Sequence, residues 1–188
     1  MAASTRGGSE EKKRKPAAGA AELIDDAPEV NVTGKALDAR IARLSTVITS
    51  RFPEFKLVPR PTNFGVLVEL PDQKRFVEFC EWILNDLDFD HSSLISGVDW
   101  LDRFEAVYHF WSNSKKLNVI MQVPVDRNDP HIPSVTRLWK GANYHERETY
   151  DMFGIKFDGH PDLRRIYLEE NYEFFPQRKD FKWGLKYG

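Results

Sequence analysis

Residues 144–167 hold the densest group of side chains in this chain that could do chemistry. The run reads YHERETYDMFGIKFDGHPDLRRIY and combines carboxylates, arginines and histidines. Glu146 and His160 are of the types that serve as general acid and base in enzymes. The same residue types also form buried networks that hold one segment of a protein to another. The spacing of these residues and the elements that carry them decide between the two interpretations.

Other kinds of site find little support. His145-Glu146 begins like a zinc-protease motif, but Thr149 stands where the second histidine should be. The five histidines show no paired ligand spacing, so no metal site is predicted. No phosphate loop and no glycine-rich dinucleotide turn is present. The single cysteine, Cys80, cannot hold an iron–sulfur cluster, which needs about four thiolates, and its place in an apolar stripe indicates a buried, inert thiol.

The ionisable run is predicted to begin on a helix. Ser134 can cap a short helix through Trp139, and a second helix is predicted from Ala142 to Phe153, ending at Gly154. Helical spacing then places one carboxylate in the middle of an apolar stripe formed by Trp139, Ala142, Glu146, Tyr150 and Phe153. A buried carboxylate must be paired or hydrogen-bonded. We therefore favour a structural network over an active site.

The partners of that carboxylate are expected to come from the arginine pair. After an extended Ile155–Phe157 step and an Asp158-Gly159 turn, the chain is expected to double back on the helix. Arg164 and Arg165 would then reach Glu146 and Asp151, with His160 bracing the corner. Arg147 and Asp151 can also pair at i,i+4, while Glu148 points elsewhere. The network predicted from these residues comprises Glu146, Arg147, Glu148, Asp151, His160, Arg164 and Arg165, and Arg164→Ala should disturb it.

The elements upstream predict an α+β domain. Amphipathic helices are expected over 37–52 and 73–85, and strands over 55–59, 64–70, 91–100, 104–111 and 117–123. The fold class is thus two helices packed on a mostly antiparallel sheet of about five strands, followed by a helix and a long extended C-terminal segment. The strand over 104–111 carries aromatics on both faces, which predicts that both faces are covered. Residues 125–133 are expected to be a loop.

Composition divides the chain into three parts. Residues 1–33 are predicted to be a disordered or partner-ordered N-terminal extension. Residues 34–132 are predicted to form the α/β domain, and residues 133–188 the helix that carries the ionisable run together with the extended C-terminal segment. Hydrophobic content of 41% suffices for a core, and a formal net charge of -2 argues against nucleic-acid binding. No apolar run approaches the roughly 20 residues that span a bilayer. Membrane contact is therefore expected only through other chains.

The C-terminal segment is rich in aromatic and basic side chains. Such a segment is expected to be buried against a partner protein, although it could instead fold back on its own domain. The residues assigned to this interface tail are Phe174, Phe175, Arg178, Lys179, Phe181, Trp183 and Tyr187.

The motif HERETYDMFGIKFDGHPDLRRI closely resembles the signature of the 30-kDa subunit of respiratory complex I, also called the C subunit of NADH:quinone oxidoreductase. The resemblance runs from Glu146 through Asp151 and Gly154–Ile155 to Gly159–Ile166, and 178–181 resembles the family's continuation. Tyr167 departs from the usual small aliphatic residue, and 173–177 departs from a glycine-bearing run.

The resemblance implies a cofactor-free subunit in the peripheral arm, or quinone module, of a proton-pumping NADH dehydrogenase. FMN and iron–sulfur clusters would lie in other subunits, and the chain would not be catalytic on its own. Its partners would be the large quinone-pocket subunit and neighbouring iron–sulfur subunits. Its location would be peripheral, on the cytoplasmic side of the inner (plasma) membrane rather than the mitochondrial matrix side.

Two alternatives remain open beside that function. The same role could serve a relative of complex I that is fed by reduced deazaflavin, ferredoxin or hydrogenase. Alternatively, Glu146 and His160 could form a proton-handling pair near the quinone site.

Overall fold

The structure is a computed structural model that describes residues 34–182, with side chains from Leu37 onward. The predicted N-terminal extension and two residues of the predicted interface tail, Trp183 and Tyr187, lie outside the described residues. The elements, in order, are α2 (Gly34–Arg51), β1 (Lys56–Arg60), the 3₁₀ helix η1 (Pro61–Asn63), β2 (Gly65–Glu69), α3 (Phe76–Asn85), β3 (His91–Asp99), β4 (Phe104–Ser112), β5 (Leu117–Val125), β6 (His131–Pro133), α4 (Ala142–Phe153) and β7 (Lys156–Asp158).

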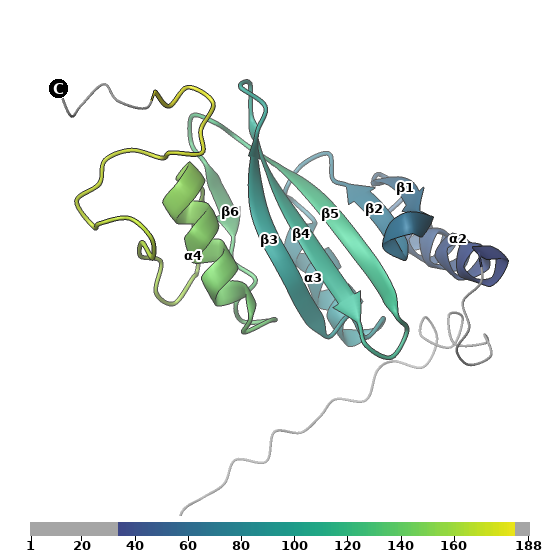
Figure 1. Ribbon diagram of the computed structural model, residues 1–188. Coiled ribbons are helices and arrows are strands. Elements are labelled where there is room, and N and C mark those ends of the chain that lie inside the picture. The colour runs from purple at the N-terminus through teal and green to yellow at the C-terminus, as the bar shows by residue number, and fades with distance from the viewer. Residues whose placement is uncertain (1–33, 183–188) are drawn as a thin grey trace, which may run out of the picture.

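The main sheet has five strands in the order β1-β2-β5-β4-β3 (Figure 1). β1 and β2 form the predicted antiparallel hairpin, and β3, β4 and β5 form the predicted antiparallel meander. The two units are joined by a parallel pairing of β2 with β5, in which Val66 lies opposite Val119. The predicted α+β class and the mostly antiparallel five-stranded sheet are confirmed.

One face of this sheet carries the hydrophobic core. α2 buries a stripe at helical spacing and α3 buries another, because apolar residues three and four apart share one side of a helix. Phe52, at the end of α2, meets Phe79 of α3 at a ring distance of 5.1 Å, and Phe76 of α3 meets Tyr108 of β4 at 5.1 Å. Within the described residues the helices pack on this one face of the sheet (Figure 1). The sequence predicted that both faces would be covered, and in the described part of the chain only this face is.

Two predicted elements differ from those in the structure, the start of α3 and the short helix after Ser134. α3 begins at Phe76 rather than at residue 73, because the Asp72 side chain accepts the backbone N–H of Lys74 at 2.9 Å and holds a turn there. The short helix expected after Ser134 is a turn in which Leu138 and Trp139 both donate to the carbonyl of Val135.

The residues predicted as a loop over 125–133 contain the short strand β6. It pairs in parallel with β7, with Ile132 opposite Phe157. β6 is three residues long, too short for a period-two pattern to appear in the sequence. The pairing fixes the chain on both sides of α4.

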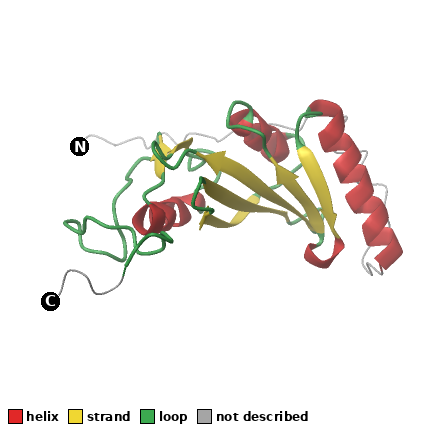
Figure 2. Ribbon diagram, turned by 90° about the horizontal axis from the view of Figure 1, so that it is seen from above, coloured by secondary structure: helices red, strands yellow, loops and turns green. Residues whose placement is uncertain are grey.

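α4 lies beside β3, the edge strand of the main sheet (Figure 2). Gly97 makes this contact possible, since a Cβ there would stand 2.7 Å from the ring of Phe153. The hydroxyl of Thr149 donates to the carbonyl of Ile95 at 3.4 Å. α4 thus shields a strand edge that would otherwise be open to pairing, and it holds the ionisable run next to the sheet.

Candidate functional site

The candidate site is the contact between α4 and residues 160–182, which we call the strap. In Figure 1 the strap leaves the end of β7 and loops around α4. α4 ends at Gly154, which has φ 75° and donates its N–H to the carbonyl of Tyr150 at 2.8 Å, as predicted. A Cβ at this position would lie 2.6 Å from Nη2 of Arg178 and 2.6 Å from the ring of Phe175. Glycine is therefore needed here both for the left-handed conformation and for the close approach of the strap.

Asp151 is the centre of the site. Its Oδ2 accepts three successive backbone N–H groups of the strap, from Ile166 at 3.1 Å, Tyr167 at 2.8 Å and Leu168 at 3.1 Å. Its Oδ1 accepts Nη1 of Arg165 at 2.7 Å. Burial alone would raise the pKa of the fully buried Asp151, but the donors from Tyr167 and Arg165 outweigh it and lower the pKa. The carboxylate is therefore ionised and bound by the strap's own backbone.

Two of the three arginines of the network, Arg147 and Arg165, also bind the strap. Arg165 donates to the carbonyls of Asp151 and Tyr172 at 3.1 and 2.6 Å. Arg147, one turn before Asp151 on α4, donates to the carbonyls of Arg164 and Arg165 at 3.1 and 3.3 Å. α4 thus presents a cation to strap carbonyls and an anion to strap N–H groups. The predicted contact of Arg165 with Asp151 is present, whereas Arg147 binds the strap rather than Asp151.

Glu146 has partners other than those predicted. Its Oε2 accepts the Ser134 hydroxyl at 2.6 Å and its Oε1 accepts the backbone N–H of Val135 at 2.7 Å. Burial raises the pKa of Glu146 to about 7, although these two hydrogen bonds favour the ionised form. Arg164 is exposed and pairs with Asp162 at 2.9 Å. The prediction that the arginine pair reaches Glu146 is therefore wrong. The Ser134 hydroxyl and the Val135 N–H bind this carboxylate instead, and neither brings a second charge into the protein interior.

His160 braces the corner between β7 and the strap, as expected. Its Nδ1 accepts the N–H of Asp162 at 3.0 Å, which leaves Nε2 to donate to the carbonyl of Asn143 at 3.2 Å. Burial lowers the pKa of His160. His160 and Glu146 share no hydrogen bond in the described part of the chain. Glu148 is half-buried on α4 and, over residues 34–182, has no hydrogen bond to the other members of the predicted network.

The later part of the strap lies along its own domain. Phe175 meets Tyr150 of α4 at a ring distance of 6.5 Å. Arg178 donates from Nε to the carbonyl of Phe153 at 2.7 Å, and its guanidinium lies 4.4 Å from the centre of the Phe175 ring. Phe174 and Phe181 are 6.3 Å apart. As far as residue 182, the chain follows the alternative in which the tail folds back on its domain, and burial of the tail against a partner stays a prediction.

Sequence reasoning missed the anchor at the far end of the strap. Asp99, at the end of β3, accepts the N–H of Lys179 at 2.9 Å and forms an ion pair with Arg127. Arg127 also pairs with Asp180 at 3.0 Å. Asp99 and Lys179 are 80 residues apart in the chain. The sequence carries no signal of a contact at that separation.

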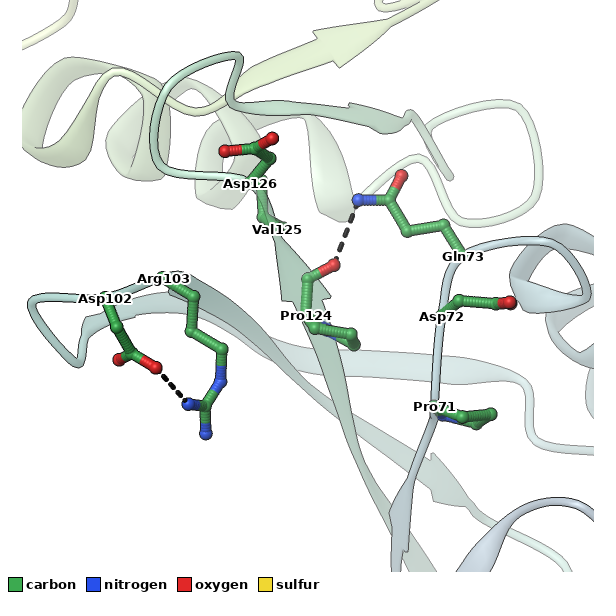
Figure 3. A pocket seen from close by; sticks show the side chains of 8 residues that line it. All are labelled: Pro71, Asp72, Gln73, Asp102, Arg103, Pro124, Val125 and Asp126. Atoms are coloured by element: carbon green, nitrogen blue, oxygen red, sulfur yellow. Dashed lines mark hydrogen bonds and ion pairs between the residues drawn. The ribbon is translucent and has the colours of Figure 1, made fainter.

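Over residues 34–182, no group of three or more His, Cys, Asp or Glu side chains is placed to hold a metal ion. None of the described helices combines the length and apolar character needed to cross a membrane. An open hollow of about 400 Å³ lies between Pro71–Gln73, Asp102–Arg103 and Pro124–Asp126 (Figure 3). Asp126 precedes Arg127, which pairs with Asp180 of the strap.

Comparison with known proteins gives concordant matches. The family model described as "Respiratory-chain NADH dehydrogenase, 30 Kd subunit" matches residues 70–187. A relative from Rhizobium meliloti (strain 1021), the second C subunit of its NADH-quinone oxidoreductase, is 50% identical over 122 residues, covering 62% of this chain and 66% of the relative. The corresponding C subunit of Roseiflexus sp. (strain RS-1) is 46% identical over 118 residues, covering 60% and 68%. The match thus spans slightly less than two thirds of the Rhizobium meliloti relative.

Solved structures agree with the fold. The trypsin-resistant fragment, residues 1–134, of Nqo5 matches with a TM-score of 0.57 and 33% identity, covering 64% of this chain and 98% of the fragment. A chain of the membrane-bound sulfane sulfur reductase, an archaeal respiratory membrane complex, matches with a TM-score of 0.59, covering 76% and 85%. Its identity of 20% supports the fold alone. With the family model covering more than half of its residues, the chain belongs to the family of the 30 kDa subunit of respiratory-chain NADH dehydrogenase.

Proposed function

We propose that this chain is a cofactor-free structural subunit of a proton-pumping NADH:quinone oxidoreductase of the complex I type. In this role it supports assembly of the peripheral arm and thereby electron transfer from NADH, through FMN and iron–sulfur clusters of other subunits, to quinone. Family membership and the names of the relatives support the proposal. The chain would act as a translocase component that is not catalytic on its own.

The observation that carries the proposal is which groups the charged residues of the signature contact. Asp151, Arg147 and Arg165 bind the backbone of the strap, and none of the three is turned toward the open hollow described above. Hydrogen bonds of this kind fix the position of a segment. The seven predicted network residues are accordingly assigned a structural role, which centres on these three.

The outward side of the strap is proposed as the surface that meets the large quinone-pocket subunit. Tyr144 of α4 is 69% exposed and Tyr167 of the strap is 67% exposed, and Phe174 is exposed as well. Exposed aromatic side chains are typical of protein–protein contact surfaces. The strap would thus be held by its own helix on one side and by the partner on the other. Neighbouring iron–sulfur subunits and a peripheral position on the cytoplasmic side of the membrane belong to the same proposal.

One observation favours a second candidate, a proton-handling role for Glu146. Its carboxyl is buried, and its pKa of about 7 lets it exchange a proton near neutral pH. The Ser134 hydroxyl that binds it lies 2.8 Å from the Thr136 hydroxyl, which is half-buried. Normal assembly with a shifted pH optimum of quinone reduction in a Glu146→Gln complex would favour this role over the structural one.

The proposed function is tested by recovering the native assembly. The tagged chain is expressed in its host, membranes are extracted with a mild detergent, and the purified material is analysed by mass spectrometry. We expect a large quinone-pocket subunit, iron–sulfur subunits and an NADH-oxidising module. Donor subunits for deazaflavin, ferredoxin or hydrogen in place of that module would change the electron donor. Recovery of the chain alone at its monomer mass would overturn the proposal.

A further inference from the structure

The sheet has a second face, opposite the core, which we call the outer face. Strand register places a continuous row of side chains across it, because paired residues on neighbouring strands point to the same side. The row runs through all five strands as Val58, Leu67, Ile120, His109 and Leu94. The next rows add Val107 with Gln122, and Val98 with Glu105 and Pro124. Most of this surface is uncharged.

The described helices leave this face uncovered. Leu67 and Ile120 are only 7% and 8% exposed, yet neither is part of the contiguous core cluster on the other face of the sheet. Leu94, on the edge strand, is 41% exposed. Figure 1 shows α3 behind β3, β4 and β5 and no helix in front of them. Burial lowers the pKa of His109, so its ring is neutral at pH 7 and adds no charge to the middle of the row.

One end of the outer face is acidic and contains an unsatisfied carboxylate oxygen. Oε1 of Glu105 is buried and, within residues 34–182, has no hydrogen-bond partner. Glu105 lies opposite Pro124, which lines the open hollow described above. The hollow also has Asp126 and Asp102 on its rim, the latter paired with Arg103 at 2.9 Å (Figure 3). Arg103 and Trp100 favour the ionised form of Glu105, but burial outweighs them and raises the pKa of this carboxyl. A buried carboxylate oxygen without a donor is unfavourable, so a further cation would stabilise this end of the face.

We propose that the outer face and the adjoining hollow form a docking surface for a second subunit of the same complex. The partner would lay apolar side chains on the row through Leu67 and Ile120 and place a lysine or arginine beside Glu105 and the hollow. This inference rests on the proposed function, but it concerns the sheet face opposite the core rather than the contact between α4 and the strap. The acidic rim disfavours the anionic alternatives, a lipid surface or a nucleic acid. An apolar centre with a charged, complementary rim is the usual construction of such protein interfaces.

Site-specific photocrosslinking tests the proposal in the assembled complex. A photoreactive phenylalanine analogue is placed at Val107, on the outer face, and, as a matched control, at exposed Thr49 on α2. After irradiation of purified complex, we expect a crosslink from position 107 to one other subunit, at a peptide containing lysine or arginine, and no crosslink to that subunit from position 49.

The other outcomes distinguish failure of the docking surface from failure of the proposed function. An assembled complex without a crosslink from position 107 to another subunit would overturn the docking surface and leave the proposed function intact. A crosslink to a second copy of the chain, or to its own residues 1–33, would also overturn it. Failure of the unsubstituted chain to enter any complex would instead overturn the proposed function.

Charge substitution supplies an independent test that does not depend on a crosslinker. The double substitution of Glu105→Gln with Asp102→Lys removes acidic groups from this end, because Asp102 is an exposed residue of the hollow. Asp38→Lys, at an exposed position of α2, is the charge-reversal control. We expect about tenfold less of the double variant in the complex, because rim charges of the wrong sign oppose docking, with the melting temperature of the free chain unchanged. Incorporation equal to that of the Asp38→Lys chain would overturn the proposal.

Discussion

At the scale of single residues, Asp151 and Glu146 show how differently two buried carboxylates on one helix can be stabilised. Asp151 receives a cation and three backbone N–H groups, and these lower its pKa. Glu146 accepts hydrogen bonds from one hydroxyl and one backbone N–H. These two bonds lower its pKa by less than burial raises it, so the pKa rises to about 7. Asp151 therefore acts as a fixed charge, whereas Glu146 changes its protonation state near neutral pH.

Replacing Asp151 by Asn should release the strap. An amide keeps the shape but cannot accept three N–H groups and a guanidinium with the same strength, and it leaves Arg165 buried without its anion. We expect a loss of about 3 kcal/mol in the free energy of unfolding. Chemical denaturation measures this, and hydrogen exchange at 166–168 should rise. Asp162→Asn, which alters an exposed pair with Arg164, is the control, and equal effects of the two substitutions would contradict the assignment.

Replacing Glu146 by Gln should flatten the pH dependence of stability. The pKa of this carboxyl rises from its ordinary value of 4.5, which applies to the unfolded chain, to about 7 on folding, so the folded state holds the proton more tightly. The stabilisation that this carboxyl gives the folded state is complete below pH 4.5 and is lost as the pH rises through 7. The total loss in the free energy of unfolding is about 3 kcal/mol. Denaturation of the native chain between pH 5 and 8 should show that fall, and the Gln variant should not. Identical profiles would show that Glu146 is ionised throughout.

At the scale of elements, the strap and α4 form one unit, because their contacts run from residue 147 to residue 178. At Gly154 the strap packs closely against the end of α4. The conformation of Gly154 and its lack of a side chain allow Arg178 to reach the carbonyl of Phe153, the last residue of the helix. A second glycine, Gly159, has φ 83° but nothing within 4 Å of the position a Cβ would take.

These two glycines separate backbone strain from packing. Gly154→Ala and Gly159→Ala both place alanine in the left-handed region, which costs about 1–2 kcal/mol each. Only Gly154→Ala also displaces Arg178 and Phe175, so we expect it to lower the melting temperature further and to increase proteolysis of the strap. Equal melting temperatures for the two variants would show that the strap does not pack at Gly154.

Elements with a local pattern were predictable from the sequence, and elements held by distant partners were not. The stripe of α2 and the turns of the meander are readable within a short window, because periodicity and turn chemistry are local. The glycine end of α4 and the pairing of Asp151 with Arg165 also followed from local geometry. β6, the binding of Glu146 at Ser134, and the anchor of Lys179 on Asp99 depend on tertiary contacts. No periodicity or spacing in one sequence reports such contacts.

At the scale of the whole molecule, the domain has a strap side and an outer sheet face, and each is proposed to meet a different surface of the complex. The strap side is organised by buried charges, and the outer face by apolar side chains. Loss of the contacts on one side should therefore weaken assembly more than it destabilises the domain, because most of the hydrophobic core lies between the sheet and the helices α2 and α3.

The arginine pair allows this to be tested. The sequence alone suggested Arg164→Ala as the disruptive change, but the structure shows Arg165 buried against Asp151 and Arg164 exposed. We expect Arg165→Ala to reduce the amount of assembled complex several-fold, since it leaves a buried carboxylate without its cation, and Arg164→Ala to have little effect. Quantitative immunoblotting of native gels measures both. Full assembly with slow quinone reduction in the Arg165→Ala complex would point to a direct catalytic role.

The parallel pairing of β2 with β5 has a consequence for how the chain folds during synthesis. The β1-β2 hairpin and the β3-β4-β5 meander each consist of contacts close in sequence, so each can form soon after it leaves the ribosome. The second edge of β2 can pair only after β5 has been synthesised, because Val66 of β2 lies opposite Val119 of β5. Closing that loop costs more chain entropy than forming either local unit. Until it occurs, the hairpin exposes an unpaired strand edge, and the risk of misassociation is greatest in that interval.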